Sequence, residues 1–220
     1  MHEITWPADE AERARSMNRF DRIEPARTAL IVIDLQVAFL EEGYTAYCRH
    51  APDILPNVNR LARAVREAGG LVVYTRHTTL DDPVRGPPPW QRQMPNLASY
   101  FASLEPDAPG HALHEGLDVR PQDLIVDKVR YSAFLPISSS LDADLRARGI
   151  DTVIITGTVT NVCCESSARD AHMLNYKVFF VSDANAAGTD EAHNATLANM
   201  GLLFADVRRT EELLPLIEVG

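Results

Sequence analysis

The chain has 220 residues, enough for one large domain with a substantial buried core. Its 21 Lys and Arg residues are outnumbered by 31 Asp and Glu residues, which gives a formal net charge of -10. This charge repels the polyanionic backbone of nucleic acids and anionic lipid surfaces, so we expect neither as a partner. No window approaches the ~20 apolar residues that a membrane span requires.

The three cysteines, an odd number, do not form the disulfide framework typical of secreted domains. The N-terminal stretch is strongly charged, with acidic residues interspersed, and it has no apolar core, unlike a signal or transit peptide. A reduced, cytoplasmic location is the simplest interpretation. We expect residues 1–27 to form an N-terminal arm or a packed helix, and residues 28–220 to form the domain.

Six short apolar runs, rich in Val, Ile or Phe, predict six strands. Continuous apolar runs of this length are typical of strands buried on both faces, as in a parallel sheet. The predicted strands are 28–34, 70–76, 123–128, 151–157, 177–183 and 202–207.

Between these strands, segments 51–70, 137–150 and 189–202 have apolar residues at helical spacing, with polar residues near the start and Gly near the end. The alternation predicts a three-layer α/β/α, Rossmann-like fold with a six-stranded, mostly parallel sheet in the order 3-2-1-4-5-6. The exception is segment 78–122, which is long and Pro-rich. Such connections tend to be lids or binding loops.

Three chemically capable side chains fall at the predicted strand ends, where ligands bind in a fold of this kind. Asp34 ends the first strand, Lys128 ends the third, and Cys163 follows the fourth. In the predicted order the first and fourth strands flank the crevice, so Asp34 and Cys163 face each other. Lys128 must then reach in on its long side chain.

Cys163 lies where a strand gives way to a predicted helix. The positive end of a helix dipole and a nearby Lys ammonium would both lower the pKa of its thiol. A carboxylate could take the thiol proton and deliver it to a leaving amine, while backbone N–H groups hold an oxyanion. The alternatives are structural: a buried apolar cysteine, a turn-forming Asp34 and a solvated Lys128.

Cys163 and Cys164 are adjacent, which strains the geometry of a mutual disulfide. In a helix they point about 100° apart, so one can face the crevice while the other packs inward.

Other candidates carry weaker signals. His111 and His114 have i, i+3 spacing without clear partners for a metal site. We expect His77 to lie in a solvated loop, and Cys48 has no motif around it.

Three blocks, "ALIVIDLQVAFL", "DLIVDKVRYSAF" and "IITGTVTNVCCESSARDA", resemble the isochorismatase-like cysteine hydrolases over residues 28–207. Relatives include N-carbamoylsarcosine amidohydrolase and the biuret, ureidoacrylate and streptothricin hydrolases. The resemblance implies an isochorismatase-like hydrolase domain over residues 28–220 with a catalytic triad of Asp34, Lys128 and Cys163. It implies no cofactor and, by analogy, a homodimer or homotetramer.

The family pattern Gly-x-x-Thr-x-x-Cys runs here through Gly157, Thr160 and Cys163. The resemblance therefore assigns the nucleophile to the first cysteine of the pair. It also implies a cis peptide bond before Val159, whose N–H would form the oxyanion hole together with that of Cys163. Phe39 matches a family position that walls the substrate pocket.

Two departures from relatives narrow the expected chemistry. The stretch "VVYTRHTTLDD" lacks the Asp-x-His spacing of the nicotinamidase metal site, so we expect no metal and doubt nicotinamide as the substrate. The intact triad favours an amidase over a hydrolase of an isochorismate-like vinyl ether. We therefore expect hydrolysis of a non-peptide C–N bond in a small amide, ureido or lactam-type substrate, through a thioester.

Several side chains are candidates for shaping the pocket, each with packing or loop anchoring as the alternative: Trp90, Tyr131 and Asn161. Arg130 is a candidate partner for a substrate carboxylate, or forms a surface salt bridge. Two other classes remain as alternatives. A non-catalytic binding member would share the fold, and a phospho-receiver-like module would need an acidic pair where "VIDLQ" has one acid.

Overall fold

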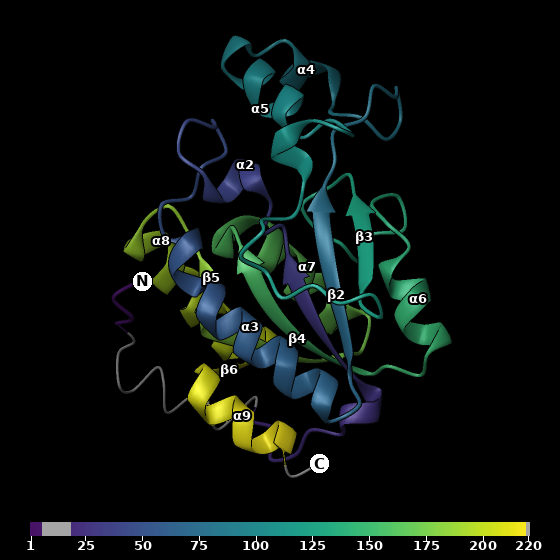
Figure 1. The fold of residues 1–220 in the computed structure, drawn as a ribbon, viewed down its shortest axis with the longest axis vertical. Helices are drawn as coiled ribbons and strands as arrows, with labels where there is room; N and C mark the ends of the chain where they lie inside the picture. Colours follow the sequence, from purple (N-terminus) through teal and green to yellow (C-terminus); the bar gives the residue numbers. More distant parts are fainter. Residues whose placement is uncertain (6–18, 219–220) are drawn as a thin grey trace.

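The computed structural model describes residues 1–5 and 19–218, with a six-stranded parallel sheet at the centre (Figure 1). The strand order is β3-β2-β1-β4-β5-β6, which confirms the predicted order. The strands are β1 (Thr28–Ile33), β2 (Leu71–His77), β3 (Leu124–Lys128), β4 (Thr152–Thr158), β5 (Lys177–Ala186) and β6 (Asp206–Arg208).

Helices cover both faces of the sheet. One face carries α3 (Ala51–Glu67) and α9 (Thr210–Glu218), in front of the strands in Figure 1. The other carries α6 (Leu141–Ala147), α7 (Glu165–Met173) and α8 (Asp190–Asn199). Every residue of β1 is buried because its side chains alternate between the two layers. The continuous apolar runs therefore predicted this three-layer fold correctly.

The sixth strand differs from its prediction. The run expected at 202–207 forms a strand only at β6, because Met200–Phe204 continues α8 as a π-helical turn, η5. Met200 and Gly201 are buried in that turn. A short apolar run suits a buried helix end as well as a buried strand, and here the helix prevails.

Residues 78–111 of the Pro-rich segment form a cap above the carboxyl ends of the strands, and residues 112–122 run back past α3 toward the start of β3 (Figure 1). The cap contains short helical pieces joined by loops: α4 (Pro89–Arg92), η2 (Pro95–Leu97), α5 (Ala98–Ser103) and η3 (Pro109–His111). Three further short turns complete the elements: η1 (Pro25–Arg27), α2 (Val37–Leu40) and η4 (Thr160–Cys164).

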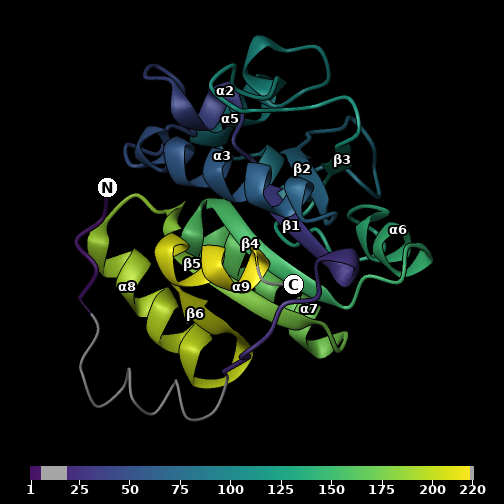
Figure 2. The same ribbon diagram turned by 60° about the horizontal axis from the view of Figure 1, so that its bottom comes forward.

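The described parts of the N-terminal segment pack on the domain: residues 1–5 lie beside α8 in Figure 2, and residues 19–27 run from β6 to the start of β1. The His2 ring stacks on His193 with centroids 4.1 Å apart and accepts a hydrogen bond from the Ala187 N–H at 2.9 Å. Ile23 is also buried in the core. Residues 6–18 of the expected arm lie outside the described residues. In the part of the chain that is described, no helix has the length and apolar character needed to cross a membrane.

Candidate active site

Asp34 and Lys128 form a buried ion pair at the carboxyl ends of β1 and β3. Lys128 Nζ lies 2.7 Å from Asp34 Oδ2, and neither side chain is exposed to solvent. A carboxylate oxygen of Asp34 also lies within 4.8 Å of Cys163 Sγ. The structure thus brings together the three residues that the strand ends predicted would converge.

The local backbone positions Asp34. Its φ of 51° is in the left-handed region, which Asp tolerates better than most residues, and its N–H donates to the Thr75 carbonyl at 3.2 Å. Thr75 Oγ1 donates to Asp34 Oδ1 at 2.7 Å. Apart from the lysine ion pair, Oδ2 has no hydrogen-bond partner among the described residues. That oxygen can therefore accept a further proton.

Gly157 allows the fourth strand to approach the first at this point. Its φ is 119°, and an added Cβ would overlap the backbone of Ile33, the residue before Asp34. Only glycine tolerates this combination, so Gly157 sets the spacing between the strand that carries Asp34 and the strand that leads to Cys163.

Lys128 Nζ has further acceptors around it. The ammonium lies 3.2 Å from His77 Nδ1 and donates to the Arg130 carbonyl at 3.1 Å. Burial lowers the pKa of Lys128, but the negative charge of Asp34 and hydrogen bonding raise it more, so the net pKa lies above its ordinary value. The lysine is therefore a fixed positive charge beside the thiol.

Cys163 lies in η4, the π-helical turn that leads into α7, and is 3% exposed. Burial raises the pKa of its thiol to about 12, and the Lys128 charge offsets only part of this. The resting thiol is therefore neutral, contrary to the lowered pKa expected from the helix start, because desolvation outweighs the nearby positive charge. Cys164 is fully buried in the core, which confirms its predicted packing role. The Thr158–Val159 peptide bond is cis, as the resemblance implies.

His77 was expected in a solvated loop, and this expectation is wrong. It is the last residue of β2, 7% exposed, and it contacts Lys128. Burial, with the Lys128 charge as a second cause, lowers the pKa of His77 to about 3, so the ring is neutral at pH 7. Its place directly after the predicted strand 70–76 is the same signal that singled out Asp34 and Lys128 at strand ends.

The side chains of Asp34, His77 and Cys163 offer metal-ligand atoms within 4.8 Å of one another. Lys128 Nζ contacts two of these three residues, at 2.7 Å and 3.2 Å. A metal ion here would meet the resident ammonium charge, so the arrangement suits a lysine-centred site rather than a metal centre.

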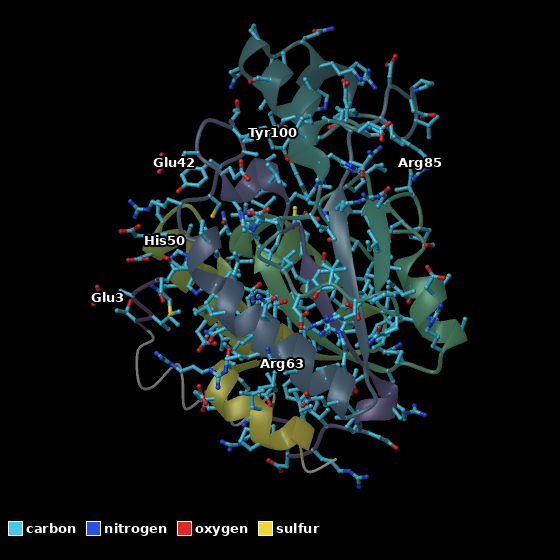
Figure 3. The ribbon with its side chains drawn as sticks, viewed as in Figure 1. Glu3, Glu42, His50, Arg63, Arg85 and Tyr100 are labelled. Atoms are coloured by element: carbon cyan, nitrogen blue, oxygen red, sulfur yellow. The ribbon has the colours of Figure 1, made fainter. Side chains whose placement is uncertain are left out.

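A cavity of about 250 Å³ opens onto Cys163. Its other lining residues are mostly apolar or aromatic: Phe39, Ala46, Gln91, Leu97, Tyr100, Phe101, Tyr131, Val159 and Val162. Tyr100 comes from α5, above the carboxyl ends of the strands, and was not predicted (Figure 3).

The predicted pocket residues divide into two groups. Phe39 and Tyr131, both candidates for the pocket, line this cavity, and so does Val159. Trp90 is 61% exposed, Asn161 is also exposed, and neither lines it.

The family model described as the isochorismatase domain matches residues 28–212. The chain belongs to the isochorismatase family.

Similar proteins include enzymes named for amide hydrolysis. Ureidoacrylate amidohydrolase RutB of Pseudomonas savastanoi pv. phaseolicola is 32% identical over 212 residues, covering 87% of this chain and 84% of that protein. A cysteine hydrolase from Pseudomonas syringae pv. phaseolicola 1448A has a TM-score of 0.84 at 34% identity, covering 92% and 97% of the two chains. N-carbamoylsarcosine amidase from Thermoplasma acidophilum has a TM-score of 0.67 at 25% identity, covering 84% and 97%.

The remaining candidates have structural roles in this isochorismatase-family chain. Arg130 donates to the carbonyls of Val84 and Arg85 and so anchors a loop of the cap. His111 Nε2 lies 2.8 Å from Thr78 Oγ1, whereas His114 Nδ1 accepts a hydrogen bond from a nearby backbone N–H. The two histidines thus have separate partners.

Proposed function

We propose that the chain is a cysteine-dependent amidohydrolase that cleaves a C–N bond of a small amide, ureido or lactam-type substrate through a thioester. The observation that carries this proposal is the fully buried Asp34–Lys128 pair beside the Cys163 thiol. A neutral buried thiol needs a base to attack a carbonyl, and Asp34 is the carboxylate within reach.

In the first half of the reaction, Asp34 Oδ2 takes the thiol proton as Cys163 Sγ bonds to the substrate carbonyl carbon. The Lys128 ammonium balances the negative charge that develops, and the N–H groups of Val159 and Cys163 hold the oxyanion. The C–N bond then breaks, the proton on Asp34 passes to the leaving nitrogen, and ammonia or an amine departs.

In the second half, Asp34 takes a proton from water and the resulting hydroxide attacks the thioester. The C–S bond breaks, the carboxylic acid leaves, and the proton returns to Cys163 Sγ. Each half uses one proton transfer to Asp34 and one from it, so the enzyme ends as it began.

The similar proteins support this class of reaction, since two of them are named as an amidohydrolase and an amidase. The mostly apolar lining of the cavity at Cys163 also supports it, because charges act more strongly where water is excluded.

A screen for ammonia or amine release tests the proposal, with biuret, ureidoacrylate-like amides and cyclic lactams as candidates. We expect turnover by the wild type, none by Cys163→Ala, and retained turnover by Cys164→Ala, which removes the adjacent buried thiol as a matched control. Unchanged turnover in Cys163→Ala would contradict the mechanism. Binding of an amide without any turnover would identify a non-catalytic member instead.

A further inference from the structure

A second cavity, of about 220 Å³, adjoins the one at Cys163. Four residues line both cavities: Gln91, Tyr100, Phe101 and Tyr131. The second cavity is also lined by His77, Thr79 and Arg130, and a ring nitrogen of His77 lies within 4.8 Å of Cys163 Sγ. A substrate with its scissile amide at Cys163 could therefore place the rest of its length there.

His77 presents a hydrogen-bond donor beside this second cavity. The Lys128 ammonium can only donate, so His77 Nδ1 accepts from it and the neutral ring carries its proton on Nε2. No described residue accepts a hydrogen bond from Nε2, although the residue is 7% exposed and lines the cavity. A donor that lines the cavity without a protein partner can bind an acceptor on a ligand there.

The His77 ring is held in place. Gln36 Oε1 accepts a hydrogen bond from the backbone N–H of His77 at 2.7 Å, and Gln36 Nε2 donates to the backbone carbonyl of His77 at 3.1 Å. The ring lies nearly parallel to that of Tyr131, at 19° with centroids 6.1 Å apart. The Nε2–H donor is therefore preorganised.

Two further polar residues line the second cavity. Thr79 also lines the second cavity, and its buried hydroxyl has no hydrogen-bond partner within the described residues. Arg130 lines the cavity too, but its guanidinium donates to loop carbonyls. The His77 Nε2–H and the Thr79 hydroxyl are therefore two donors of this wall without a partner among the described residues.

We propose that the second cavity is the subsite for the part of the substrate beyond the scissile amide, and that His77 Nε2–H binds an acceptor oxygen there. The inference rests on the proposed amidohydrolase function and narrows its substrates to amides that carry a second oxygen acceptor, a carbonyl or a carboxylate. His77 is then both a positioning residue for Lys128 and a determinant of specificity.

Matched amides test this proposal. Malonamide, succinamide, glutaramide and adipamide each carry a second carbonyl, and each is compared with the monoamide of equal chain length and the corresponding amide with a terminal carboxylate. We expect kcat/KM for the best acceptor-bearing amide to exceed that of its monoamide roughly tenfold in the wild type, the value of one hydrogen bond. Comparison of the diamides with the amides that carry a terminal carboxylate shows whether a carbonyl or a carboxylate is the preferred acceptor. Equal values across every wild-type pair would overturn the proposal.

The variants separate substrate recognition from a general loss of activity, because the quantity compared is the ratio of kcat/KM between the acceptor-bearing amide and its monoamide. We expect His77→Phe, which removes the donor, to bring the ratio close to one, and His77→Gln, which keeps an N–H donor, to restore part of it. His114→Phe makes the same change at a histidine outside both cavities and should leave the ratio unchanged. A wild-type ratio in His77→Phe would contradict the assignment.

Binding to Cys163→Ala, measured by calorimetry, makes the test independent of turnover. We expect tighter binding of the acceptor-bearing amide, lost when His77→Phe is added. If binding shows this preference while no amide is hydrolysed by the wild type, the subsite stands and the proposed function fails. If amides are hydrolysed without any preference, the subsite fails and the proposed function stands.

Discussion

Lys128 Nζ lies 2.7 Å from Asp34 Oδ2 although both side chains are completely buried. A pair in this position often stabilises a protein no better than apolar residues of the same size would, because both charges lose their hydration. The proposed mechanism accounts for its place beside Cys163: there the carboxylate moves protons and the ammonium balances the negative charge during attack.

The ion pair leads to a prediction about stability and activity. Asp34→Asn and Lys128→Met should each abolish turnover and each lower the free energy of unfolding by about 3–5 kcal/mol, since each leaves one buried charge unpaired. The double variant should lose less stability than the sum of the two single variants. Urea unfolding at pH 7 measures the free energy of unfolding of the wild type, the two single variants and the double variant. If the loss in the double variant equals the sum of the two single losses to within about 0.5 kcal/mol, the two residues are not coupled.

Gly157 gives a second prediction, with Gly149 as its control. Both have positive φ, 119° and 70°, but a Cβ at Gly157 would overlap Ile33 whereas a Cβ at Gly149 meets open space. Gly157→Ala should lower the free energy of unfolding by at least ~3 kcal/mol, and Gly149→Ala by only ~1 kcal/mol. Equal losses in chemical denaturation would show that the close approach of the two strands is not the cause.

The buried neutral His77 predicts how stability depends on pH. Its pKa of about 3 in the folded chain lies below the ordinary value of 6.5, so between these values the unfolded chain binds more protons. The contribution of His77 to the free energy of unfolding is therefore fully present above pH 6.5. It decreases as the pH drops toward 3, by roughly 1 kcal/mol per pH unit.

His77→Gln removes the titrating group, so its unfolding free energy should fall less steeply between pH 6.5 and pH 4 than that of the wild type. Parallel curves for the two proteins, measured by urea unfolding at each pH, would contradict the assigned pKa shift. His114→Gln, at a histidine for which the structure shows no Lys128 contact, provides the control.

Two aromatic residues of the cap should differ in their effect on substrate binding. Tyr100 lines both cavities, so Tyr100→Ala should raise KM by tenfold or more through lost packing. Trp90 is 61% exposed and lines neither, so Trp90→Ala should change KM less than twofold. Steady-state kinetics with any hydrolysed amide compares them, and the reverse order would show that the cap closes differently over substrate.

The convergence of Asp34, Lys128 and Cys163 could be predicted because the sheet and its strand order follow from apolar runs, and strand ends meet at one edge. His77 obeys the same rule, but it stands in the polar run "TRHTT", which suggested a loop. Its burial depends on the cap and on Lys128, neither of which a local pattern reveals.

The structure of the cap could not be predicted from the sequence. Gln91 and Tyr100 belong to short helical pieces with no long apolar period, so their position over Cys163 is a product of tertiary packing. Trp90 was a candidate for shaping the pocket, with packing or loop anchoring as the alternative, yet its side chain is 61% exposed. The pKa of Cys163 was misjudged for a related reason, because helix position is local whereas burial is not.

The most direct measurement is rapid-quench mass spectrometry of the enzyme with a hydrolysed amide. We predict a transient acyl adduct on the peptide that contains Cys163, with the mass of the substrate less its leaving ammonia or amine. The adduct should be sensitive to hydroxylamine, absent in Cys163→Ala and retained in Cys164→Ala. An adduct carried by Cys164, or full turnover by Cys163→Ala, would contradict the assignment of Cys163 as the nucleophile.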